Sequence, residues 1–193
     1  MREKGPDKVS LDPGSYLERR TLILGDVNTG KTALTSRILE AMCEAGLGER
    51  IMALDLAPEI PPEVLVEKDL VGVGGFLKVP EARGVLYSRP RILPPRLMAK
   101  RPEEAISIAQ ENLEAIEAIL ERLPEARDIL FVNDMSLYLH AGDATRLISL
   151  LSKFDTVVAN AYRGTKLPQG PISSREREQV DILAHFFDLV VEL

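Results

Sequence analysis

The residues best suited to chemistry form one stretch near the start of the chain, Gly25-Asp26-Val27-Asn28-Thr29-Gly30-Lys31-Thr32. The stretch fits the phosphate-binding pattern G-x-x-x-x-G-K-[ST], in which the backbone N–H groups of a glycine-bearing loop surround a phosphate. In this pattern Lys31 reaches the β and γ oxygens of a nucleotide, and the Thr32 hydroxyl holds Mg²⁺. A plain glycine-bearing turn is the alternative interpretation.

The residues on either side of this loop favour the phosphate interpretation. An apolar, strand-like run at 21–24 precedes it, and a helix-like run begins near Lys31. Gly25 and Gly30 allow backbone angles that other residues resist, and the helix N-terminus directs positive potential at the same phosphate. We therefore predict a nucleotide site with ATP and Mg²⁺ as cofactors. Its expected binding residues are Gly25, Asp26, Asn28, Thr29, Gly30, Lys31, Thr32 and position 33, which is Ala33.

Two further acids end buried, strand-like runs. Asp55 follows the apolar residues 51–54, and Asp134 follows the apolar residues 129–132 and Asn133. Because the carboxyl ends of parallel strands meet at one edge of a sheet, both acids are expected near the phosphate loop. We predict Lys31, Asp55 and Asp134 as catalytic residues. The alternative is that either acid only begins a turn or caps a helix. Met135 follows Asp134, so the paired acid of many motor ATPases is missing.

The elements that must position these residues alternate between strand and helix. Strands are expected at about 20–25, 51–56, 128–134, 155–160 and 188–192. Helices are expected at about 31–46, 102–123 and 142–152, with a last helix that Ser173 or Ser174 caps and that ends near Phe186. This order predicts an α/β three-layer sandwich with a mainly parallel sheet of about five strands.

Residues 57–102 differ from the rest and are called the excursion below. They carry eight of the thirteen prolines, and no long periodic segment is present, although 84–87 is a candidate short strand. We predict one domain over residues 1–193, with the excursion as a lid or substrate-binding segment over the strand ends. The expected anion clamp is formed by arginines and the expected hinge by glycines: Arg89, Arg91, Arg96, Arg101, Gly72, Gly74 and Gly75. A simple surface loop is the alternative.

From about residue 20 to residue 60, the chain resembles one large class of phosphate-loop proteins. That class includes the MinD-like ATPases, the signal-recognition GTPases, dethiobiotin synthetase and the RNA 5′-hydroxyl kinases of the cleavage-factor type. The likeness is looser at the strands ending in Asp134 and Asn160. It implies that Asp55 lies beside the γ-phosphate and orients a nucleophile or helps to hold Mg²⁺. One departure is that Asp26-Val27 stands where the MinD branch has a second lysine.

The strand that ends in Asn160 bears on the choice of base. Ala161-Tyr162-Arg163 replaces the guanine-reading pattern N-K-x-D, so ATP is favoured over GTP. Tyr162 is a candidate for stacking on the base. Asn160 either contacts the base region or ties down a turn.

Composition limits the partners. The formal net charge is −6, which argues mildly against a nucleic-acid coat protein but leaves nucleic acid open as a partner. Cys43 is the only cysteine, and the charged first ten residues lack an apolar signal segment, so we expect a cytoplasmic protein. No apolar run is long enough to span a bilayer, and no membrane partner is expected. His140 and His185 are too far apart in sequence to suggest a metal pair.

Two functions follow from these residues. The first is an Mg²⁺-dependent ATPase or phosphotransferase acting at the γ-phosphate, with an unidentified anionic acceptor. The second is a nucleotide-gated switch with slow hydrolysis and a protein partner. A loop that serves structure alone is a third possibility.

Overall fold

One parallel sheet organises the chain. The computed structural model describes residues 2–4, 9–67, 75–81, 83–123 and 126–193. Seven strands follow the order β1-β7-β2-β6-β5-β3-β4, and every pairing is parallel. Their bounds are β1 Arg2–Lys4, β2 Arg20–Gly25, β3 Ile51–Asp55, β4 Leu86–Ser88, β5 Ile129–Asn133, β6 Thr156–Tyr162 and β7 Leu189–Glu192.

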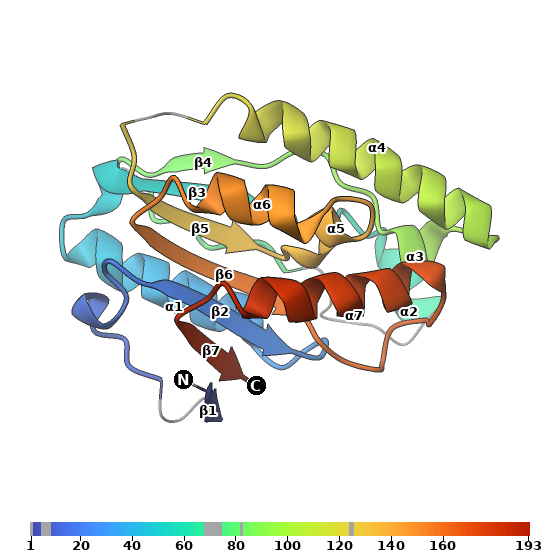
Figure 1. Ribbon diagram of the computed structural model, residues 1–193, viewed down its shortest axis with the longest axis horizontal. Helices are drawn as coiled ribbons and strands as arrows, with labels where there is room; N and C mark the ends of the chain where they lie inside the picture. Colours follow the sequence, from blue (N-terminus) through green and yellow to red (C-terminus); the bar gives the residue numbers. More distant parts are fainter. Residues whose placement is uncertain (1, 5–8, 68–74, 82, 124–125) are drawn as a thin grey trace.

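Helices cover both faces of the sheet (Figure 1). One face packs against α1, which runs from Lys31 to Glu44, through a core that includes Ile38 and Phe131. The other face carries most of the remaining helices, and its core includes Leu54 and Leu130. These helices are α4 Pro102–Leu120, α5 Ser136–Leu139, α6 Ala144–Leu151 and α7 Pro171–Ala184. The sheet is thus the middle of three layers, because alternate residues of its central strands face opposite helical layers.

The predicted fold class is confirmed, and all five expected strands are present within two residues of their expected ends. Two strands, β1 and β4, extend the sheet beyond these five. The polar residues 1–19, broken by Pro6, Pro13 and Gly14, predict an irregular lead-in, yet residues 2–4 form β1 and pair with β7 at the sheet edge. Charged side chains are common on edge strands, where they discourage pairing with other molecules.

The start of α7 corrects another expectation. The helix begins at Pro171, directly after Gly170, so Ser173 and Ser174 lie inside its first turn. The Ser173 hydroxyl donates a hydrogen bond to the Pro168 carbonyl at 3.1 Å rather than accepting one from the helix. Proline is favoured at the first helical position because its missing N–H has no partner to lose there. The proline, not a serine, therefore marks the boundary.

The excursion, residues 57–102, contains short regular elements. They are α2 Pro62–Glu67, β4 and α3 Pro95–Met98. The candidate strand at 84–87 appears as β4, which pairs with β3 at the opposite edge of the sheet from β1. Gly72 and Gly74, expected as hinge residues, lie outside the described residues.

None of the helices in the described ranges combines the length and the apolar character that crossing a bilayer requires.

Candidate functional site

The loop between β2 and α1 has the geometry of a phosphate cradle. Gly30 is the N-cap of α1 with φ 92°, and Asn28 has φ 60°, so both lie in the left-handed region. A Cβ at Gly30 would meet nothing within 4 Å, so the space in front of the helix is open. A Cβ at Gly25 would come within 2.6 Å of Thr29 Oγ1. The missing side chain of Gly25 therefore lets Thr29 pack close to the backbone, and that of Gly30 permits a left-handed φ.

Lys31 and Thr32 occupy the first turn of α1 beside this space. The Lys31 ammonium donates to the Asp26 carbonyl of its own loop at 2.6 Å. Burial lowers the pKa of Lys31, while the charges of Asp134 and Asp26 act in the opposite direction. The Thr32 hydroxyl donates to Asn133 Oδ1 at 3.1 Å. Both side chains therefore point toward the ends of the neighbouring strands.

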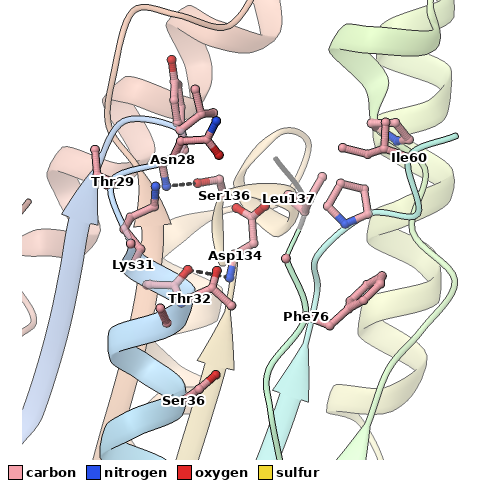
Figure 2. Close-up of a pocket in the computed structure, with 18 of the residues that line it drawn as sticks. Asn28, Thr29, Lys31, Thr32, Ser36, Ile60, Phe76, Asp134, Ser136 and Leu137 are labelled. Carbon is pink, nitrogen blue, oxygen red and sulfur yellow. Dashed lines mark hydrogen bonds between the residues drawn. The ribbon is translucent and has the colours of Figure 1, made fainter. Parts of the chain in front are cut away.

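Asp134 lies directly after β5 and lines the same space (Figure 2). Its φ is 56°, and its N–H donates to Asn160 Oδ1 at 2.9 Å, which fixes this turn. No described residue donates a hydrogen bond to its carboxylate. Burial raises the pKa of Asp134 to about 6, although the cations Lys31 and Arg96 oppose the rise. A strained backbone and a poorly solvated acid are typical of functional positions.

Asp55 ends β3 in a different environment. Its side chain is fully buried and does not line the cavity. Four donors surround its carboxylate: the N–H groups of Leu77 at 2.7 Å and Ala57 at 3.2 Å, the Tyr87 hydroxyl at 2.9 Å and Asn133 Nδ2 at 2.7 Å. Two strands, β6 and β5, separate β3 from β2, and the Asp55 carboxylate is linked to Thr32 of the loop through the Asn133 amide. The placement of Asp55 beside a γ-phosphate, which the family resemblance implies, stays a prediction.

Asn133 connects the two acids to the loop, and sequence reasoning missed it. Its Nδ2 group donates to Asp55 and to the Gly75 carbonyl at 3.0 Å. Its Oδ1 atom accepts from Thr32 and from Asn160 Nδ2 at 2.9 Å. Every hydrogen-bonding position of the amide is used, because an amide offers two donors and two acceptor lone pairs. The sequence did contain a sign of this role: Asn133 places an amide at the last position of the otherwise apolar strand β5.

A cavity of about 810 Å³ opens between the loop and the excursion. Figure 2 shows Lys31 and Thr32 on one side of it and Ile60 and Phe76 on the other, with Asp134 between. We use the name apolar wall for six apolar residues that line the cavity: Pro58, Ile60, Phe76, Pro94, Leu97 and Leu137. Five of these six residues belong to the excursion, so parts of this segment do face the strand ends.

The four clamp arginines separate in the structure. Arg89 pairs with Glu59 at 2.9 Å and stacks on Phe76 with its guanidinium 4.2 Å from the ring centre. Arg101 pairs with Glu104, and Arg91 is exposed. Only Arg96 lines the cavity, where it forms an ion pair with Glu176 of α7.

The segment after β6 packs on the phosphate loop. The Asp26 carboxylate accepts from the N–H of Thr165 at 3.0 Å, and a Cβ at Gly164 would lie 2.2 Å from that carboxyl carbon. Burial raises the pKa of Asp26, but hydrogen bonds from the backbone of Thr165, Val27 and Lys166 outweigh it and leave the pKa below its ordinary value. Gly164 is therefore required for this close contact.

Tyr162 and Asn160 are buried side chains that line the cavity, and the stacking of Tyr162 on a base stays a prediction. The Tyr162 ring is buried, with Lys31 Nζ 5.9 Å and Arg96 Cζ 5.3 Å from its centre. Asn160 is buried and ties the Asp134 turn to α1 through Thr35. Of the two roles weighed for Asn160, this geometry matches the turn.

Among the described residues, no group of three or more His, Cys, Asp and Glu side chains is placed to hold a metal. The oxygens of Thr32 and Asp134 fit Mg²⁺, which commonly keeps several waters and takes few protein ligands.

No protein-family model matches the chain, and comparison with curated proteins gives no match either. Among solved structures, the chain is similar to the crystal structure of the flagellar accessory protein FlaH from Methanocaldococcus jannaschii, with a TM-score of 0.50 and 11% sequence identity. The match covers 92% of this chain and 71% of that chain. At this identity the likeness concerns the fold alone. Together with the parallel sheet and the loop that joins β2 to α1, it indicates a fold of the P-loop NTPase type.

Proposed function

We propose that this protein binds Mg·ATP at the loop 25–32 and acts on the γ-phosphate, as an ATPase or a phosphotransferase. The observation that carries the proposal is the convergence of Lys31, Thr32 and Asp134 on one cavity at the carboxyl edge of the sheet. Ligands of parallel α/β folds bind at this edge, where the strand ends and helix N-termini meet.

Each of these residues has a defined part in the proposal. The loop N–H groups and Lys31 hold the phosphates, and Lys31 must leave the Asp26 carbonyl to do so. Thr32 and Asp134 hold Mg²⁺ directly or through water. When bound, the ion supplies positive charge that offsets the charge developing on the phosphoryl oxygens.

Asp55 acts as a positioning residue in this proposal. It holds Asn133, and Asn133 in turn orients the Thr32 hydroxyl and the Gly75 carbonyl. Asp55 also anchors the N–H of Leu77, so it fixes the segment that contacts α1 through the Lys78 N–H and the Ser36 hydroxyl. Removing it would therefore disturb the site without removing a group that touches the nucleotide.

The same hydrogen bonds favour a second function, a nucleotide-gated switch. Asn133 joins Thr32, which is expected to sense the metal, to Gly75 of the excursion. A change at Thr32 would therefore reach a surface segment through one side chain, as a switch with a protein partner requires. The two functions differ in what accelerates turnover: a small acceptor for an enzyme, a protein for a switch.

Titration calorimetry with Mg·ATP tests nucleotide binding. Replacing Lys31 by Ala is expected to weaken binding by about 1.5–3 kcal/mol, the scale of a charge-assisted hydrogen bond. Lys153→Ala is the matched control, because Lys153 is exposed at the end of α6, away from the cavity. Unchanged affinity in Lys31→Ala would remove the loop from the binding site.

Turnover tests the part assigned to Asp134. Asp134→Asn keeps the size of the side chain and the tolerance for φ 56°, since asparagine also enters the left-handed region. We expect ATP affinity to change little and turnover to fall by roughly 100-fold, because a charge that stabilises the transition state is lost. Equal losses in affinity and turnover would place Asp134 in binding alone.

A further inference from the structure

Arg96, His140 and Glu176 form a buried cluster at the cavity wall that the proposed function does not use. Glu176 is shared: one carboxylate oxygen accepts from Arg96, and the other lies 3.3 Å from His140 Nε2. The three side chains are only 6%, 5% and 5% exposed, respectively. They come from α3, the residue after α5, and α7, so three separate elements deliver them to one place.

The cluster leaves hydrogen-bonding atoms without partners. Arg96 Nε, Arg96 Nη1 and His140 Nδ1 are buried and have no described partner. A polar atom that is buried without a partner destabilises the fold, and most buried polar atoms in native proteins are paired. A cluster with three unpaired atoms at a cavity wall is therefore incomplete by itself.

The chemistry of these atoms defines what would complete the cluster. The Arg96 nitrogens are donors only and require a partner with acceptor oxygens. His140 Nε2 faces the Glu176 carboxylate, so this nitrogen carries the proton and Nδ1 is an acceptor. Burial lowers the pKa of His140 to about 3, which keeps the ring neutral at physiological pH. A partner must therefore present an acceptor to Arg96 and a donor to His140.

The residues around the cluster indicate the size of the charge and the apolar character that a ligand would need. Leu97 follows Arg96 directly, Pro94 precedes it by two residues, and Leu137 precedes His140 by three; all three belong to the apolar wall. An apolar pocket with a few convergent polar groups is the usual form of a small-molecule site. The carboxylates of Glu176 and Asp134 disfavour a doubly charged phosphate, so a singly charged carboxylate fits better.

The cluster lies next to the phosphate loop. Arg96 Cζ and Lys31 Nζ approach the same Tyr162 ring, at 5.3 and 5.9 Å from its centre. A molecule held at Arg96 would thus lie near the lysine of the phosphate loop.

We propose that the cluster and the apolar wall bind a second ligand, a small hydroxy acid with an apolar body. Arg96 donates to its carboxylate, and His140 Nδ1 accepts from its hydroxyl group. The inference rests on the proposed function only in taking the nucleotide to occupy the neighbouring loop.

Three related probes test this chemistry by titration calorimetry on the full chain saturated with Mg²⁺ and a non-hydrolysable ATP analogue. Mandelate carries a phenyl ring, a carboxylate and an adjacent hydroxyl; phenylacetate lacks the hydroxyl; mandelamide lacks the charge. We expect mandelate to bind most tightly, with phenylacetate about 5-fold weaker and mandelamide at least about 10-fold weaker. Equal binding of all three probes, or of none, would overturn the proposal.

Variants then assign the contacts. Arg96→Gln is expected to weaken mandelate binding at least about 10-fold, whereas Arg91→Gln, an exposed arginine of the same segment, leaves it unchanged. His140→Phe should remove the preference for mandelate over phenylacetate, which a purely structural role would not predict. If Arg96→Gln does not fold, the double variant Arg96→Gln/Glu176→Gln removes both charges and tests the same contact. Full mandelate affinity in the folded variant contradicts the assignment.

The titrations with the ATP analogue present distinguish a failure of this inference from a failure of the proposed function. Mandelate should bind alongside the ATP analogue, so displacement of one by the other would mean that the probe occupies the phosphate loop and would overturn the inference. If the analogue does not bind at all, the proposed function fails, and the order of the three probes on the free protein still decides the inference.

Discussion

Strands β3 and β5 are neighbours, and each is followed or ended by a carboxylate, yet the two strand ends differ in every physical respect. Asp55 is fully buried, accepts four hydrogen bonds and does not line the cavity. Asp134 has a left-handed backbone, accepts none from the described residues, and lines the cavity. The first carboxylate holds protein groups in place, and the second is available to a ligand.

The difference shows that a hydrogen-bonded carboxylate and a carboxylate without donors have different roles in one site. A buried carboxylate with four donors stabilises the fold, because each donor would otherwise be buried unpaired. A carboxylate without donors beside a cavity costs stability, and such costs persist where function requires them. The contrast can be tested by treating the two acids alike.

The largest expected effect is on stability. Asp55→Ala leaves the Leu77 N–H, the Ala57 N–H and Asn133 Nδ2 without their acceptor, and we expect the free energy of unfolding to fall by about 4 kcal/mol. Asp134→Ala removes a poorly solvated charge but places alanine at φ 56°, so the two changes should offset to within about 1 kcal/mol. Urea denaturation of both variants measures the difference. Similar losses in the two variants would contradict the contrast.

A smaller effect is expected with pH. The pKa of Asp134 is about 6 in the folded protein and about 3.9 when unfolded. The folded state therefore holds this proton more tightly, and the free energy of unfolding falls as pH rises from about 4 to about 6. After allowance for solvent in the cavity, the fall is about 2 kcal/mol.

The matched variant for this test is Asp134→Asn, which has no proton to lose. Denaturation at a series of pH values should show that the difference in stability between parent and variant grows from pH 4 to pH 6 and is constant above about pH 7. Mg²⁺ requires the ionised carboxylate, so its affinity should increase with pH over the same range. Parallel curves for the two proteins would mean that Asp134 titrates normally.

The smallest expected effect on stability comes from Tyr87, the most exposed of the four donors to Asp55. Tyr87→Phe removes one of the four donors and leaves the ring in place, and the tyrosine is 40% exposed. We expect the free energy of unfolding to fall by about 1 kcal/mol, with Mg·ATP affinity unchanged. Denaturation and calorimetry on one sample check both. A large loss of ATP affinity in Tyr87→Phe would instead indicate that Asp55 is in direct contact with the nucleotide site.

The sequence was sufficient for the sheet, the phosphate loop and the ends of most elements. Those features depend on local patterns: apolar runs for β3 and β5, glycines for the loop, and Pro102 with two acids for the start of α4. The different surroundings of Asp55 and Asp134 could not be predicted, because they depend on strand order and on long-range contacts. Nothing within either run says that β6 and β5 stand between β2 and β3.

Long-range pairing explains the other missed residues. Arg96 meets Glu176 eighty residues later, and His140 meets it thirty-six residues later. Each of the three looks ordinary in its own segment, and their burial together appears only after α3, α5 and α7 pack around the cavity. The sequence identified Arg96 as one of four equivalent arginines, and tertiary packing separates it from the others.

The position of the Tyr162 ring near two cations has a practical consequence for spectroscopy. The chain contains no tryptophan, so an indole introduced by Tyr162→Trp would be the only one in the protein. Its emission would respond to movement of Lys31 and of Arg96, because nearby cations shift the energy of an aromatic ring. One fluorescence signal would then follow two binding events in real time, and adding the ligands in either order would resolve which arrives first.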